Sequence, residues 1–163
     1  MTPSSRNLIA GIARTLEQDV LPDLAMSTWT ASYIRSCLAL LAHLEVRVVE
    51  EGPFLFEDNA ELRSLLLSLR ADLAALPDAA AVAAAALAVG RAAGDYPSID
   101  ALTEENTRLK SALEYLVAAI HDGRDTLGEA RFQDVHGRVL AYLRRSGDRE
   151  FVMFEKASGY SPL

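Results

Sequence analysis

Several residue types are scarce in this chain of 163 residues. It contains one cysteine, nine glycines and six prolines, and aromatic residues make up 7% of it. A single cysteine, Cys37, excludes an internal disulfide, and because it lies in an apolar run we expect a reduced, buried thiol and a cytoplasmic protein. The few glycines and prolines, in a sequence dominated by alanine and leucine, favour helices over strands.

Positive charge and long apolar runs are also scarce. The 23 acidic and 16 basic residues give a net charge of -7, which opposes attraction to nucleic acid or to an anionic membrane. The longest uncharged stretch, 79–90, is much shorter than the about 20 residues that a membrane-spanning helix needs. The N-terminus has no sustained apolar region, so we expect no signal peptide. Nucleic-acid and membrane partners are therefore not expected.

The first third of the chain predicts two amphipathic helices, because apolar residues recur at three- and four-residue spacing. We expect Pro22 to end or kink the first helix, and Gly52 with Pro53 to stop the second, which covers 30–50. The apolar face of the second helix is wide enough to imply burial on more than one side. That face comprises Tyr33, Ile34, Cys37, Leu38, Leu41, Leu44 and Val48.

The middle of the chain predicts a leucine-striped helix and an alanine-rich one. Asp58 or Asn59 is placed to cap the first of these, whose stripe runs from Leu62 to Leu76. Asp78 is placed to cap the second, which extends to about residue 93. Because alanine presents little side-chain bulk, we expect the second helix to pack close against a neighbour.

The last part of the chain contains the most regular apolar pattern. Residues from Ile99 to Ile120 form a heptad seam with Asn106 at a core position, where a lone asparagine often sets register or oligomeric state. This makes Asn106, Leu109 and Leu113 candidate interface residues of a homodimer; the alternative is an ordinary bundle helix. A sixth helix should cover 126–146, followed by a C-terminal extension, 146–163.

Together these patterns predict an all-α fold. We expect a single domain, 1–163, built as a mostly antiparallel bundle of five to six helices.

Recognised catalytic and metal-binding patterns are missing from the sequence. It has no Glu-x-x-His pair for a di-iron site, and His43, His121 and His136 fall on different predicted helices without companion cysteines. We therefore expect no metal and no cofactor. His121, with Arg124 nearby, lies where the fifth helix ends. The backbone dipoles at a helix C-terminus favour a positively charged side chain, which is one explanation for this histidine. The alternative is an acid/base or ligand-binding role.

Four arginines are spaced seven residues apart near the C-terminus. On a helix such residues drift by about 20° per step, so Arg131, Arg138 and Arg145 should line one side of the sixth helix, with Arg124 just before it. Guanidinium groups suit forked hydrogen bonding, so this row is a candidate site for an acidic or phosphorylated ligand. The alternative is a solvated face, because acidic residues intervene.

Three segments, "LEQDVLPDL", "YIRSCLALLAHLEVRVVEEGP" and "LKSALEYLVAAIHDG", carry a resemblance. At these positions the chain resembles a bacterial family of small helical proteins of unknown function. The resemblance covers roughly residues 7–145. Members are typically encoded beside aminoglycoside-phosphotransferase-like kinases and acyl-CoA dehydrogenases. The resemblance therefore implies an accessory protein for a kinase-like or acyl-CoA-handling enzyme.

Three interpretations of function follow. The first is a non-enzymatic, self-associating accessory or interaction protein, based on the heptad seam, the alanine-rich helix and the lack of catalytic motifs. The second is a helical bundle that binds an acidic or phosphorylated small molecule along the arginine row. A pocket of a few hundred cubic ångströms lined by those arginines would favour it. The third is an enzyme that uses His121 or His136.

Overall fold

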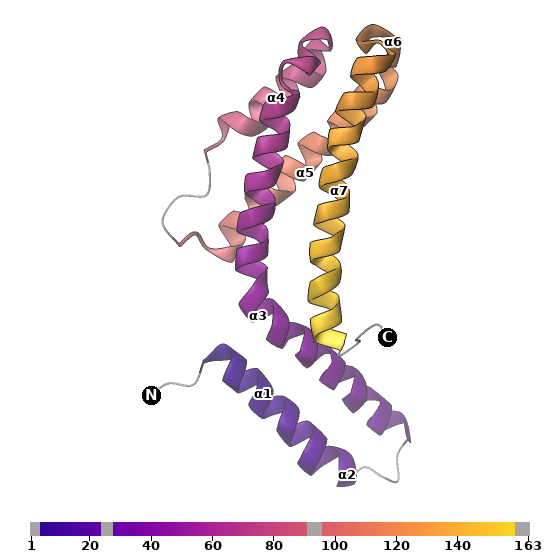
Figure 1. The fold of residues 1–163 in the computed structure, drawn as a ribbon. Helices are drawn as coiled ribbons and strands as arrows, with labels where there is room; N and C mark the ends of the chain where they lie inside the picture. The colour runs from indigo at the N-terminus through magenta and orange to yellow at the C-terminus, as the bar shows by residue number, and fades with distance from the viewer. Residues whose placement is uncertain (1–3, 24–27, 91–95, 159–163) are drawn as a thin grey trace. The chain divides into compact units, whose positions relative to one another are not determined.

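The computed structural model describes residues 4–23, 28–90 and 96–158, and every regular element in them is a helix (Figure 1). This confirms the all-α fold. In chain order the elements are α1 (Ser5–Thr15), the π-helix η1 (Leu16–Val20), α2 (Leu21–Asp23), α3 (Thr28–Leu69), the 3-10 helix η2 (Asp72–Ala75), α4 (Pro77–Ala88), α5 (Ile99–Asp122), α6 (Arg124–Leu127) and α7 (Glu129–Ser158).

The chain divides into two compact units, and the expected single domain, 1–163, stays a prediction. Unit 1 comprises Met1–Glu51 and Arg149–Leu163, and unit 2 comprises Gly52–Asp148. The helices α3 and α7 each contribute one part to unit 1 and the other to unit 2. The two units are described separately below.

The long helix α3 continues through Pro53, so the predicted stop at Gly52 and Pro53 is wrong. A proline in a helix interior costs about 3 kcal/mol, because it lacks an N–H for the carbonyl four residues back. Burial on the C-terminal side offsets this cost: Leu62 and Leu66 are fully buried. Asp58 and Asn59, the expected caps, lie inside the helix and are buried as well.

Pro22 lies inside the first helical run, one residue before Asp23, the last described residue of that run. The regular pattern is interrupted just before it by the π-helix η1. Wider π-type turns occur as local distortions within α-helices. The helix therefore does not end at Pro22, which lies within α2, two residues after the irregular turn η1. The chain after Asp23 lies outside the described residues.

Cys37 is exposed, which corrects the expectation of a buried thiol. It belongs to the part of α3 in unit 1, where none of the described side chains is buried. An apolar run in the sequence indicates a helix face that prefers to be covered, but it does not show that the same chain covers it.

Unit 2 contains the hydrophobic core. The predicted leucine stripe of α3 is buried from Leu62 to Leu69 and continues at Leu73 in η2. The helix α4 packs against α5 with three of its alanines buried, as its small side chains predicted (Figure 1). It begins at Pro77, which occupies the first helical position, so Asp78 lies in the first turn and not at the cap.

The helices after α5 differ from the prediction of a sixth helix over 126–146 followed by a C-terminal extension. Ser98 caps α5 and Gly123 ends it, but the next turn, α6, is separate. Gly128 follows with φ of +75°, a left-handed conformation that glycine adopts at little cost, and it redirects the chain into α7. The helix α7 then runs past Ser146 to Ser158, so the described part of the expected C-terminal extension continues the helix.

Candidate functional site

A buried polar cluster lies in unit 2, around Asp58. Its side chain is fully buried, and Oδ1 accepts hydrogen bonds from the hydroxyls of Tyr142, at 3.1 Å, and Ser146, at 3.2 Å. Oδ2 accepts one from Nδ2 of Asn106 at 2.8 Å and lies 3.4 Å from Nζ of Lys110. These donors from α5 and α7 satisfy a carboxylate that would otherwise be costly to bury. We name this group, together with Asn59, the buried polar cluster.

Asn106 belongs to this cluster and not to a surface between copies. Its Nδ2 also donates to Oδ1 of Asn59 at 2.8 Å, and Nδ2 of Asn59 donates to the carbonyl of Leu102 at 2.9 Å. Leu109 and Leu113 are buried in the core of the same unit. The interface predicted at Asn106, Leu109 and Leu113 is therefore packing within the chain; a heptad pattern shows that a helix face is covered, but not by which molecule.

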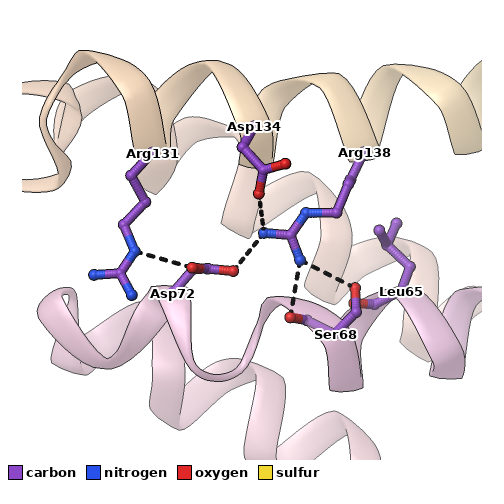
Figure 2. Close-up of polar contacts among 6 residues, drawn as sticks. All are labelled: Leu65, Ser68, Asp72, Arg131, Asp134 and Arg138. Carbon is purple, nitrogen blue, oxygen red and sulfur yellow. Dashed lines mark hydrogen bonds and ion pairs between the residues drawn. The ribbon is translucent and has the colours of Figure 1, made fainter.

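The arginine row of α7 faces acidic side chains of unit 2, as Figure 2 shows. Nε of Arg131 donates to Oδ1 of Asp72 at 2.9 Å, and Arg138 pairs with Oδ2 of the same carboxylate. Arg138 also pairs with Asp134 at 2.8 Å and donates to the backbone carbonyl of Ser68 at 2.9 Å. Asp72 thus bridges two members of the row.

This pairing shifts the pKa of both partners. The hydrogen bond from Arg138 is the largest cause that lowers the pKa of Asp72 below its ordinary value of 3.8; partial burial opposes the shift, and Arg131 adds to it. The hydrogen bond to Asp72 in turn raises the pKa of Arg138. Asp72 exposes 18% of its side chain, so the pair is less screened than a surface salt bridge.

The two ends of the row are paired as well. Nε of Arg145 lies 2.5 Å from Oε1 of Glu61. Arg124 binds Glu129 through hydrogen bonds of 2.8 and 2.9 Å; the pKa of Glu129 is lowered first by the hydrogen bond from Gln133 and then by that from Arg124. The expected free row of positive charge is thus a series of ion pairs. The intervening acidic residues indicated a balanced face, but the sequence did not identify Asp72 and Glu61 as partners.

A groove in unit 2 brings two of the arginines together. It has a volume of about 280 Å³. Its lining comprises Glu61, Ser64, Leu65, Ser68, Arg138, Ala141 and Arg145. Nε of Arg138 is buried and has no hydrogen-bond acceptor among the described residues. The groove therefore has the size of a small-ligand site, but Glu61 already neutralises one of its arginines.

His121 and His136 lie together in an aromatic cluster at the end of α5. Their ring centroids are 5.4 Å apart, and His136 stacks on Phe132 at 5.5 Å. The guanidinium of Arg124 lies 4.7 Å from the centroid of the Phe132 ring. Among the described residues no three histidine, cysteine, aspartate or glutamate side chains form a group that could hold a metal ion. The cluster thus explains both histidines as cross-helix packing.

The helices of unit 1 are joined by ion pairs around a groove of about 320 Å³. Arg6 of α1 pairs with Glu45 of α3 at 3.0 Å, and Lys156 of α7 pairs with Glu50 at 2.6 Å. None of the side chains described in unit 1 is buried, in contrast to unit 2. These polar contacts therefore hold the helices without a closed core.

Large apolar side chains are exposed on three segments of unit 1. They are Leu8 and Ile12 on α1, Trp29, Tyr33, Leu40, Leu44, Val48 and Val49 on α3, and Phe151, Val152 and Phe154 on α7. We name this set the unit 1 apolar surface. The apolar face of the second helix was expected to be buried on more than one side, and this expectation is wrong. Ile34, Leu38 and Leu41 are half-buried, while the rest of that face is exposed.

Comparisons with protein-family models, with curated proteins and with solved structures gave no match. The resemblance to the bacterial helical family thus stays an expectation. None of the described helices combines the length and the apolar character that spanning a membrane requires.

Proposed function

We propose that the protein is a non-enzymatic interaction protein that self-associates through the unit 1 apolar surface. The observation that carries this proposal is the contrast between the units: unit 2 buries its leucines, while unit 1 leaves Trp29, Tyr33 and Leu40 more than 60% exposed. Large exposed apolar side chains that gather on one part of a folded chain are typical of interaction sites. Covering them against another molecule supplies the burial that the unit lacks.

The resemblance in sequence supports a kinase-like or acyl-CoA-handling enzyme as the first partner to test beyond the protein itself. Nothing about the buried polar cluster or the ion-paired arginine row requires a reaction, since both are explained by packing and pairing in unit 2.

Light scattering after size exclusion tests self-association. We expect a molar mass of at least twice 17.7 kDa, falling toward 17.7 kDa on dilution, because mass action controls the fraction of associated protein. The measurement covers about a hundredfold range of concentration, which shifts such an equilibrium by about 2.7 kcal/mol. A molar mass of 17.7 kDa throughout that range would contradict the proposal.

A second candidate is the binding of an acidic or phosphorylated small molecule in the groove of unit 2. The groove lined by Arg138 and Arg145, with the buried Nε of Arg138, supports it. An anion there would have to compete with Glu61 for Arg145. Titration calorimetry with inorganic phosphate and with a phosphorylated metabolite, on the wild type and on Arg145→Ala, tests this candidate. Equal heats for the two proteins would contradict it.

A further inference from the structure

We propose that α3 and α7 bend where they pass from one unit to the other, so that unit 1 changes its orientation to unit 2 in solution. The bend in α3 falls at Gly52 and Pro53, and the bend in α7 falls at Gly147. We name these three residues the paired hinge. The inference goes beyond the proposed self-association and does not depend on it.

Both helices that connect the units carry a weak position at the boundary. The boundary in α3 lies immediately before Gly52, and the boundary in α7 lies immediately after Asp148. Pro53 follows the first of these glycines, and Gly147 lies next to Asp148. The sequence predicted helix ends at both places. The helices continue there, but the residues that favour an end are still present.

The backbone is less constrained at these positions than in an ordinary helical turn. Pro53 has no N–H to donate to the carbonyl of Val49, four residues before it, and its ring crowds that carbonyl. Gly52 has no Cβ, which gives its backbone the widest choice of conformations. Helices usually kink at prolines or at pairs of glycine with serine, and Ser146 and Gly147 form such a pair in α7. Both helices therefore bend most easily at the boundary.

Packing does not explain the two glycines. A Cβ added at Gly52 or at Gly147 would meet no neighbouring side chain within 4 Å among the described residues. Neither glycine has the positive φ that disfavours other residues. Alanine would thus fit at both positions, and it is the better helix former. What glycine contributes there is backbone freedom.

The side-chain packing that holds the helices straight ends near the same places. Among the described side chains, the first buried one of α3 is Leu55, and the last buried one of α7 is Ser146. Towards unit 1, the described side chains of both helices are half-buried or exposed. Each helix is therefore firmly packed on only one side of the paired hinge.

The two bends have to occur together. Because α3 and α7 connect the same two units, a change in the orientation of unit 1 bends both helices. Hinges between domains consist of a few residues that absorb a change in backbone angles, and their motions take microseconds to milliseconds. A weak position in each connecting helix meets this requirement, whereas a weak position in only one of them would not.

Distances between spin labels on the full chain test the paired hinge. One label is attached to Cys37, the one cysteine of the chain, which is exposed in unit 1. The other is attached to Leu67→Cys, an exposed position of α3 in unit 2. Pulsed electron paramagnetic resonance gives the distribution of the distance between the labels, and an excess of unlabelled chain removes distances between copies.

A pair of labels within unit 2 provides the reference width. It uses Leu67→Cys with Glu114→Cys, both exposed, in a chain that also carries Cys37→Ser. We expect the distribution across the boundary to be wider than this reference, because the orientation of unit 1 adds to the spread that the labels themselves produce.

Alanine substitutions test where the additional width arises. Gly52→Ala with Pro53→Ala strengthens α3, and Gly147→Ala strengthens α7. We expect each change to reduce the additional width and the two together to remove it. The matched control is Gly137→Ala, which also fills open space on α7 but lies within unit 2, and it should leave the width unchanged. Circular dichroism checks that all variants keep their helices.

Three outcomes would overturn the inference. Equal widths across the boundary and within unit 2 would show that unit 1 holds one orientation. A width that the boundary substitutions leave unchanged, or that Gly137→Ala reduces equally, would remove Gly52, Pro53 and Gly147 as its cause. A width that responds to the α3 substitutions alone would show that the two bends are not paired. Self-association is tested separately by the molar mass, so none of these results decides it.

Discussion

At the scale of single residues, Asp72 shows how the arginine row of α7 is used. Its carboxylate accepts from Arg131 and pairs with Arg138, so one acidic side chain neutralises two arginines of the row. The sequence predicted the row from its seven-residue spacing, but no local pattern could identify an acceptor 59 and 66 positions away.

Asp72→Asn should make the free energy of unfolding depend less on pH below neutral pH. Because the pKa of Asp72 is lowered in the folded state, its contribution is fully present above the ordinary value of 3.8 and is lost as pH falls through the lower folded value. We expect Asp72→Asn to cost about 1 kcal/mol near neutral pH and nothing at the acid end. Urea unfolding between about pH 6 and pH 2 measures this.

Asp134→Asn is the matched control for this experiment. Asp134 also pairs with Arg138, but 65% of its side chain is exposed, so the change should be smaller. Equal effects of the two substitutions would contradict the view that Asp72 is the principal partner of Arg138.

Asn106 illustrates a residue whose position was predicted and whose partners were not. The heptad seam placed it in a core, but Asp58 and Asn59 were expected to cap a helix. Because Pro53 precedes them, a new helix was expected to begin at one of these two residues. Instead α3 continues through Pro53, and Asp58 and Asn59 lie inside it, where both accept hydrogen bonds from Asn106 of α5. Local signals at a proline cannot show that tertiary burial outweighs its cost.

Asn106→Leu should lower the free energy of unfolding by about 2–4 kcal/mol, because it leaves buried acceptors on Asp58 and Asn59 without their shared donor. It should leave the molar mass unchanged, since this residue is internal. Thermal unfolding followed by circular dichroism measures the first effect, and light scattering the second. Glu104→Leu, at an exposed neighbour on α5, should be close to neutral; a comparable loss there would show that the helix and not the cluster is responsible.

At the scale of elements, most helices followed from apolar spacing, and the errors lie at their ends. The burial of the leucine stripe and the existence of the alanine-rich helix are observed as predicted. Their ends differ, because α3 ends at Leu69, before the end of the stripe at Leu76, and α4 ends at Ala88 and not near residue 93. The predicted breaks at Gly52 and near Ser146 are not observed. Glycine and proline lower helix propensity by at most a few kcal/mol, which packing along the rest of a long helix overrides.

Ala83→Leu should destabilise unit 2 through overpacking. Ala83 exposes 1% of its surface where α4 packs against α5, so three additional carbons have no room. We expect a loss of about 1–3 kcal/mol in urea unfolding. Ala84→Leu places the same side chain on the exposed side of α4 and should change stability by less than about 0.5 kcal/mol. A similar loss at both positions would contradict close packing as the cause.

At the scale of the whole molecule, the two units differ in how much they bury. Sequence reasoning expected one bundle because apolar spacing is similar in both; it cannot tell a face buried within the chain from one left exposed. For the same reason it placed the interface on α5, whose seam is filled internally, and a buried thiol at Cys37 on α3, which is exposed.

The rate of amide hydrogen exchange should therefore differ between the two parts of the helix α3. We expect amides of α3 before Glu51 to exchange faster than those after Gly52, because opening of the first part exposes little new apolar surface. Mass spectrometry of dilute protein, where association is minimal, measures this. Uniform protection over the whole of α3 would contradict the difference between the units.

The alanine-rich helix α4 has one further consequence. Shifting it along its axis by one turn replaces alanine with alanine over most of its length, so shape alone distinguishes poorly between neighbouring positions. Two guanidinium groups supply the missing distinction. Arg63 donates to the carbonyls of Leu87, at 3.5 Å, and Val89, at 2.9 Å, and Arg108 to that of Ala86 at 3.4 Å. Residues outside this helix therefore fix its position along its axis. Its alanines pack similarly in neighbouring positions, whereas the hydrogen bonds from Arg63 and Arg108 to its last carbonyls form in only one of them.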